Sequence, residues 1–249
     1  MNFEKEFGGY PFMFRFRSPN KWTISELEEG YVYFAKRSEL NDPHDSNPRM
    51  VRFTENPSEL KSFYNFISNT FPNQNAKNEF LAEYTPDTLR DFMKDKIDFY
   101  VLHYGIVCFS IHLKNFPLWA NYADNSSGLC LQFNVEKDKN LFSDLRPMNY
   151  VPEPTLINYN PQSEKDNLTE LFFHKTLDWS YEKEWRLLKV HTGRFYFKAD
   201  ALEKITIGYN AKPEFIEKVK TIVRSKYPNS HLFLMKKPTE YDKLSLTIL

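Results

Sequence analysis

Residues 178–188 read DWSYEKEWRLL, and at this stretch the pattern of the sequence changes from helical to β-rich. The segment 163–185 is predicted to begin as an amphipathic helix. The three segments that follow, WRLLKVH, RFYFKA and EKITIGY, are predicted to form successive strands. Earlier strands are predicted over residues 10–17, 31–36, 105–113, 129–135 and near 147–151, and a late one over 230–236.

Helical patterns occupy three other parts of the chain. SELEEG forms a short helix that ends at Gly30, a longer helical block covers about 57–101, and a last helix covers 213–226. We interpret the block as an insertion between two halves of a sheet, within a single domain that spans residues 1–249. This order of elements predicts an α+β fold with a mainly antiparallel sheet.

Composition excludes several classes of protein. The 249 residues carry 33 basic and 33 acidic side chains, so a broad nucleic-acid-binding surface held by net charge is not expected, although a local basic groove is compatible with these numbers. Only 7 residues are glycine, and neither G-x-G-x-x-G nor G-x-x-x-x-G-K-[ST] occurs. P-loop and Rossmann nucleotide chemistry is therefore not expected.

The location and assembly of the protein are predicted from weaker signals. The start, MNFEKEFGGYPF, has charges where a signal peptide needs an apolar run, and no stretch has the length of a membrane span. Cys108 and Cys130 lie in apolar segments, which favours reduced, buried thiols in a cytoplasmic protein without membrane contact. The 17% aromatic content leaves room for a homodimer face.

The acidic stretch YEKEWRLL allows two interpretations. If it is extended, one side presents Glu182, Glu184 and Arg186 together with Leu188, and the other side presents Tyr181, Lys183, Trp185 and Leu187. If it is helical, Glu182 and Arg186 form an ordinary i,i+4 ion pair. One interpretation is that Glu184 and Arg186 are a satisfied ion pair that holds a helix-to-strand junction. The other is that one glutamate faces a cleft and is kept ionised by the neighbouring arginine.

Two further groups are candidates for binding. Ser110 lies within a strand, and Trp119 and Tyr122 lie on one side of a helical turn, where core packing explains Trp119 well. No G-x-S-x-G surrounds Ser110, which argues against a hydrolase nucleophile. Histidines 103, 112 and 174 lack companions at metal-ligand spacing, so no metal site is predicted from them.

Arg15 and Arg17 point to the same face of the first strand, where a buried guanidinium needs an anion. The anion is either a carboxylate such as Asp42 or the phosphate of a ligand, held in a bidentate fork. Asn41-Asp42-Pro43 predicts a fixed turn bonded by a side chain.

The ordered pieces MFRFRS, LNDPHD, CFS, PLWANYADNSSGLCLQF and DWSYEKEWRL resemble the bacterial domain-of-unknown-function 2971 family. The resemblance runs from about Phe14 to Tyr209 and is weakest across 57–100. His44 departs from the pattern, because an aromatic Phe or Tyr is more usual there. The family name implies no activity.

A second, looser likeness suggests an enzymatic activity. A basic residue on the first strand, a serine or aromatic in the middle and a late glutamate look like the site of ADP-ribosyltransferases, whose split, mainly antiparallel sheet binds NAD without a glycine-rich loop. This likeness implies an NAD-consuming enzyme, of a kind found among toxins and phage-defence effectors, with NAD as substrate, no metal, and a protein, nucleic acid, small molecule or water as acceptor. The likeness implies that Glu184 is catalytic, with Glu182 as second candidate, and that Arg15 or Arg17 grips the phosphates. Ser110 and Tyr122 would line the nicotinamide pocket, and Trp119, Trp185 and Arg186 would support it from behind. Asn41 and Asp42 would contribute to binding.

Two alternatives stay open. Asp42, Asp45, Glu182 and Glu184 could bind magnesium in a metal-dependent nuclease, although no recognisable nuclease motif is present. The same pocket could also belong to a non-catalytic module that senses a nucleotide.

Overall fold

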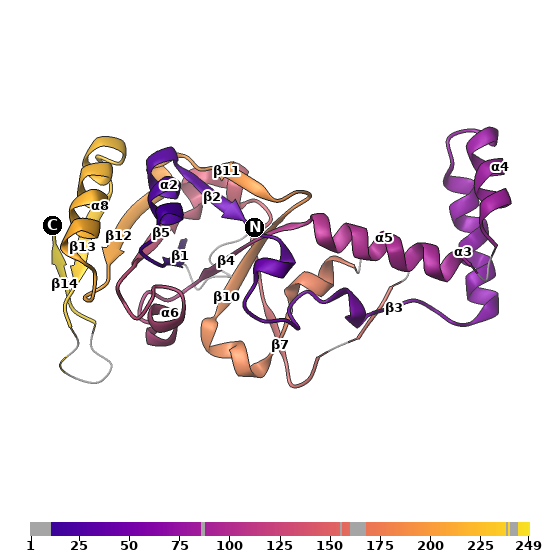
Figure 1. Cartoon of the computed structure of the whole chain (residues 1–249), viewed down its shortest axis with the longest axis horizontal. Helices are drawn as coiled ribbons and strands as arrows, with labels where there is room; N and C mark the ends of the chain where they lie inside the picture. Colours follow the sequence, from indigo (N-terminus) through magenta and orange to yellow (C-terminus); the bar gives the residue numbers. More distant parts are fainter. Residues whose placement is uncertain (1–10, 86–87, 155, 160–167, 238, 240–243) are drawn as a thin grey trace. The chain divides into compact units, whose positions relative to one another are not determined.

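The computed structural model of the protein describes residues 11–85, 88–154, 156–159, 168–237, 239 and 244–249. The chain divides into two compact units, and Figure 1 labels many of their helices and strands. The first unit combines residues 1–35, 105–148 and 178–249, and the second combines residues 36–104 and 149–177. The polypeptide therefore passes from one unit to the other four times, and neither unit is a continuous stretch of sequence.

The first unit is built on an eight-stranded sheet with the order β14-β13-β12-β5-β1-β4-β10-β6. Every neighbouring pair is antiparallel except β12 with β13. This confirms the predicted α+β class and the mainly antiparallel sheet. In sheet order the strands are β14 (Leu246–Ile248), β13 (His231–Met235), β12 (Leu202–Ile207), β5 (Leu129–Asn134), β1 (Phe12–Arg17), β4 (Gly105–Ser110), β10 (Glu184–Lys189) and β6 (Arg146–Pro147).

One face of this sheet is covered by α2 (Lys21–Glu29) and α8 (Pro213–Lys226), which contact each other (Figure 1). Leu27 and Val223 from these helices join Leu131 and Phe133 of β5 in the larger apolar core. The predicted end of the first helix is confirmed, because Gly30 caps it with a φ of 75° in the left-handed region that glycine adopts readily.

The opposite face of the sheet packs against α6 (Phe116–Asn121). Trp119 of this helix is fully buried and meets the ring of Phe16 edge-on, with 5.2 Å between the ring centroids. Cys130 of β5 lies in the same cluster. A short ribbon of β2 (Tyr31–Phe34) and β11 (Gly193–Tyr196) and the small helix α7 (Lys139–Phe142) complete the regular elements that carry the first unit's core.

The second unit contains the helices predicted for about 57–101, namely α3 (Pro57–Thr70), α4 (Gln74–Glu83) and α5 (Leu89–His103). Phe63, Phe80 and Met93 from these three helices share one apolar cluster. Two parallel pairs of short strands accompany them: β3 (Val51–Arg52) pairs with β8 (Ile157–Asn158), and β7 (Asn149–Val151) pairs with β9 (His174–Thr176).

The helix predicted to begin at residue 163 is wrong from residue 168 onward, which is the part of the segment that the structure describes. Residues 163–167 and Tyr10 of the predicted first strand lie outside the described residues. From Thr169 the chain forms a 3-10 turn, the short strand β9 and a second 3-10 turn, η5 (Leu177–Glu182), before β10 begins. The apolar triplet Leu171, Phe172 and Phe173 is buried on all its sides, so its pattern reflects a tertiary core and not one stripe of a helix.

Candidate functional site

Three residues line up across the centre of the sheet. Ser110 of β4 is opposite Phe14 of β1 on one side and opposite Glu184 of β10 on the other. Residues directly opposite each other in antiparallel strands project from the same face. The side chains of Ser110 and Glu184 therefore lie on the face that packs against α6.

Glu184 forms a buried ion pair with Arg186 on the same face of β10. The Arg186 Nε donates to Glu184 Oε1 at 2.5 Å and its second nitrogen donates to Oε2 at 3.2 Å. Glu184 is 5% exposed and Arg186 is 1% exposed. The extended interpretation of this stretch is thus correct from Glu184 onward, and the two-point contact pairs the carboxylate with a guanidinium.

Glu182 accepts hydrogen bonds from two hydroxyls of the same region, one at its carboxylate and one at its backbone carbonyl. The Tyr122 hydroxyl donates to Glu182 Oε1 at 2.6 Å, and the Ser110 hydroxyl donates to the Glu182 carbonyl at 2.7 Å. Lys183, between the two acids, has a φ of 47°, which is a strained value for a side chain other than glycine. This turn lies between η5, which ends at Glu182, and β10, which begins at Glu184, and both acids are buried.

Tyr122 lies within electrostatic range of Glu182, Glu184 and Cys108. Burial raises the pKa of Tyr122 far above its usual value, and the charge of Glu182, its hydrogen bond, Cys108 and Glu184 add to the effect. The phenol therefore stays protonated and acts as a donor to the Glu182 carboxylate at every physiological pH. Tyr122 interacts electrostatically with both Glu182 and Glu184, and we call these three residues the acidic cluster.

The α6 region holds the acidic cluster in place. Asn115 caps α6 by accepting from the Leu118 amide, and its side-chain nitrogen donates to the Tyr181 carbonyl at 2.6 Å. Trp119 donates from its indole nitrogen to the Leu113 carbonyl at 3.0 Å and is fully buried. Trp119 is accordingly a core residue that supports α6, and it presents no surface to a ligand.

Arg15 and Arg17 find a carboxylate, as one interpretation of the sequence expected, but the partner is Glu26 of α2 and not Asp42. A nitrogen of Arg15 donates to Glu26 Oε1 at 3.2 Å. Arg17 Nε lies 2.7 Å from Glu26 Oε2 and forms an ion pair with it. The N–H of Arg17 does not point at this oxygen, so neither of the two atoms has a hydrogen bond among the described residues. Burial, followed by the charge of Arg15, lowers the pKa of Arg17.

The structure does not bring these arginines to the acidic cluster. Phe14 shares a face with Ser110 and Glu184, so Arg15, the next residue of β1, projects from the other face. Arg17 follows Arg15 with the same alternation, because β1 pairs with β5 without a bulge. The sheet therefore separates the predicted phosphate-binding side chains from the predicted catalytic ones.

Asn41 and Asp42 belong to the second unit. Asp42 is buried, and its Oδ1 accepts from the His44 amide at 2.8 Å, which confirms the predicted side-chain-bonded turn, while Asn41 is exposed. Asp42 lines a small cavity of about 40 Å³, and the lining also includes Asp45, His174 and Lys175. Lys175 Nζ lies 3.9 Å from Asp45 Oδ2.

Metal-binding clusters and membrane-spanning helices are both absent from the described residues. Across this part of the chain, no group of three or more His, Cys, Asp or Glu side chains is arranged so that it could hold a metal ion. Within the same residues, no helix combines the length and the apolar composition that a membrane span requires.

Glu26 is the ion-pair partner of Arg15 and Arg17 that the sequence interpretation missed. It lies on the stripe of α2 that also buries Thr23 and Leu27, at the i, i+3 and i+4 spacing of a core-facing side. An acid on that stripe is a signal of a buried ion pair, because a carboxylate is rarely buried unless it is paired. Asn115 was also missed, and its place directly before Phe116-Pro117 is a signal for a helix cap.

Comparison with known proteins supports one of the two likenesses. Residues 118–187 match the family described as Protein of unknown function (DUF2971). The predicted resemblance to this family is thereby confirmed over residues 118–187. This stretch includes the acidic cluster, Tyr122, Glu182 and Glu184, and also Arg186, the partner of Glu184. Neither the curated proteins nor the solved structures gave a match.

Proposed function

We propose that the protein is an NAD-consuming, ADP-ribosyltransferase-like enzyme and that the acidic cluster is its active site. The observation that carries the proposal is the buried Glu184 carboxylate, which Arg186 contacts at two points while Tyr122 and Glu182 lie in the same electrostatic environment. An ionised carboxylate in a poorly solvated place is the group that stabilises positive charge developing on a sugar.

The pairing of β4 supports the split sheet that such an enzyme is expected to have. Near its end, β4 pairs with β1 at Phe14 and Ser110, and near its start Ile106 exchanges hydrogen bonds of 2.8 and 2.9 Å with Ala35. β1 and β4 therefore pair side by side over a small part of their length and diverge beyond it. Ser110 and Glu184 lie at the end where the two strands meet.

The proposed reaction breaks the bond between nicotinamide and the ribose of NAD. The electron pair of that bond leaves with nicotinamide, and the ribose becomes oxocarbenium-like, which the negative charge of Glu184 stabilises. An acceptor nucleophile then forms the new bond to the ribose and gives up its proton to Glu182 or Glu184. Arg15 and Arg17 have no part in this proposal, because Glu26 engages them on the other face.

The test is incubation of the purified protein with NAD, with and without a chelator, while released nicotinamide is quantified. We expect nicotinamide to be released at the same rate with and without the chelator. We expect Glu184→Gln to lower the rate about a hundredfold or more, because it removes a preorganised charge. Glu203→Gln is the matched control, because Glu203 of β12 pairs with Lys137 at a half-buried position away from the cluster.

Three outcomes would overturn the proposal. The first is an absence of nicotinamide release from the wild-type protein, and the second is full activity of a folded Glu184→Gln protein. The third is thermal stabilisation by NAD without turnover, which would favour the nucleotide-sensing module. Cleavage of nucleic acid that the chelator abolishes would favour the nuclease instead.

A further inference from the structure

A second feature of the molecule, a large groove in the second unit, has no role in the proposed chemistry. Its volume is about 1560 Å³, and its walls come from β3 and the segments on either side of it, from α3 and α5, and from Asn158 and Tyr159. All of these residues belong to the second unit. A cavity of this size is larger than most small-molecule sites, so an extended ligand fits it better than a compact one.

The groove is basic although the whole chain is neutral. Five basic side chains line it against three acidic ones, Glu55, Glu59 and Asp98, so that it has an excess of two positive charges. The chain as a whole has equal numbers of basic and acidic residues. The positive charge is therefore gathered at this surface by the fold, and the basic residues are Arg37, Arg49, Arg52, Arg90 and Lys94.

Three of these cations are available to a ligand. The side chains of Arg49, Arg52 and Lys94 are exposed and make no hydrogen bond or ion pair within the part of the chain that the structure describes. The other two are engaged: Arg90 lies 3.2 Å from Glu55, and Arg37 donates to the carbonyls of Asp45 and Pro43. Exposed guanidinium and ammonium groups without partners favour a ligand that carries several anionic groups in a row.

Half-exposed aromatic rings lie among these cations. Phe53 follows Arg52 directly, and Tyr159 donates from its amide to the Arg52 carbonyl at 2.8 Å. The two rings are neighbours, with centroids 6.5 Å apart. Rings beside phosphate-binding cations provide stacking surfaces for bases, and only unpaired bases can use them.

We propose that this groove binds single-stranded nucleic acid. Arg49, Arg52 and Lys94 contact successive phosphates, and Tyr159 with Phe53 stacks against a base. The inference does not depend on the chemistry proposed for the acidic cluster, since the groove is made by the second unit alone. Binding without preference for sequence is expected, because cations and ring faces read the backbone and any base.

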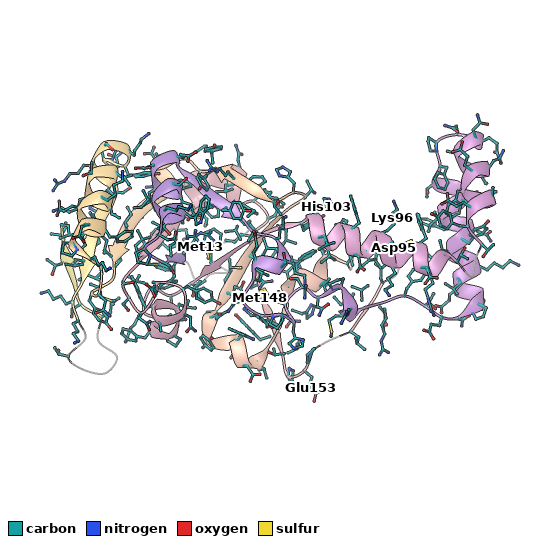
Figure 2. The ribbon with its side chains drawn as sticks, viewed as in Figure 1. Met13, Asp95, Lys96, His103, Met148 and Glu153 are labelled. Atoms are coloured by element: carbon teal, nitrogen blue, oxygen red, sulfur yellow. The ribbon has the colours of Figure 1, made fainter. Side chains whose placement is uncertain are left out.

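The experiment measures the fluorescence anisotropy of labelled 20-nucleotide oligo(U) and oligo(dT) mixed with the full chain at several salt concentrations. The variant carries Arg52→Glu and Lys94→Glu. The matched control carries Lys61→Glu and Lys96→Glu, with the same change in charge. Lys61 and Lys96 are exposed residues of α3 and α5 that do not line the groove, and Lys96 is labelled on α5 in Figure 2.

We expect the groove variant to bind about tenfold or more weakly, because each substituted cation no longer neutralises a phosphate. The salt slope should fall by about 0.7 for every phosphate that the variant leaves unneutralised, and the control should bind like the wild-type protein. Tyr159→Leu, which keeps an apolar side chain in the neighbouring cluster, should weaken binding about fivefold or more, because the base then has no ring to stack on. Circular dichroism and a thermal melt establish that each variant is folded.

The proposal fails if the groove variant and the control bind the oligonucleotide equally well, because binding would then depend on the total charge of the protein and not on the groove. It also fails if a duplex of the same length binds as tightly as the single strand, or if polyglutamate competes as well as the oligonucleotide. None of these results bears on nicotinamide release, so the two proposals can fail separately.

Discussion

Arg15 and Glu184 project from opposite faces of one sheet, although only β4 separates their strands. Each of the two side chains has found an oppositely charged partner on its own face, Glu26 for Arg15 and Arg186 for Glu184. The sheet thus contains two buried ionic centres, one beneath α2 and one near α6, and they make different contributions to stability and function.

The centre beneath α2 is expected to be structural. Glu26→Gln leaves the buried Arg15 and the half-buried Arg17 without a counter-charge, so the free energy of unfolding should fall by about 3 kcal/mol. Urea unfolding measures the change. Glu28→Gln, on the exposed side of the same helix, should cost at most about 1 kcal/mol. Similar losses for the two variants would contradict the assignment of Glu26 as the buried anchor.

The pair of Glu184 and Arg186 can be separated into packing and charge. Arg186→Met leaves an uncompensated buried carboxylate and should lower the free energy of unfolding by about 3–5 kcal/mol. The double variant Glu184→Leu/Arg186→Met removes both charges and should recover most of that loss. A double-mutant cycle in urea gives the coupling between the two sites. Additive losses would show that the two charges do not depend on each other.

Much of the first unit could be predicted from local patterns. The alternation in YPFMFRFR and the apolar run in LCLQFNV indicate strands, and β1 and β5 do form the centre of the sheet. The helices of the second unit and α8 follow from apolar spacing in the same way. These predictions succeed because periodicity is a property of a short segment and of the one face that it buries.

The arrangement of the site could not be predicted, because it depends on register between distant strands. The sequence shows that Arg15 and Arg17 share a face, but only the pairing of Phe14 with Ser110 decides that this is not the face of Glu184. The helical prediction that fails beyond residue 168 has a similar cause. Phe172 is buried by long-range contacts, including a stacked ring of Tyr104 at 5.1 Å, and these override the local helical pattern.

The two cysteines are expected to differ in reactivity, because only one of them is fully buried. The sequence predicted two buried thiols, yet Cys108 is partly exposed whereas Cys130 is 1% exposed. Burial raises the pKa of the Cys130 thiol, which makes the reactive thiolate scarce. A chromogenic disulfide reagent at pH 8 should therefore modify one thiol in the native protein and the second only in urea.

Single substitutions assign the two phases of that reaction. Cys108→Ser should remove the fast phase, and Cys130→Ser should remove the phase that requires unfolding. Fast modification of a native Cys108→Ser protein would show that Cys130 is accessible and that the cluster beside α6 opens readily.

Tyr227 gives the protein a stability that depends on pH in the alkaline range. Its hydroxyl donates to the Leu27 carbonyl at 2.7 Å between α8 and α2, and burial raises its pKa to about 12 from an ordinary 10.0. Between these two values the unfolded chain loses the phenolic proton while the folded chain keeps it. The contribution is therefore complete below pH 10 and is lost as the pH rises toward 12.

The comparison with Tyr227→Phe isolates this contribution, because every other titrating group is present in both proteins. At pH 8 the wild-type protein should be more stable than the variant by about 1 kcal/mol, the usual net value of one hydrogen bond. Urea unfolding at successive pH values should show that this advantage shrinks above pH 10 and that the variant becomes the more stable protein near pH 12. A constant difference across that range would mean that the phenol of Tyr227 ionises equally easily in the folded and unfolded chains.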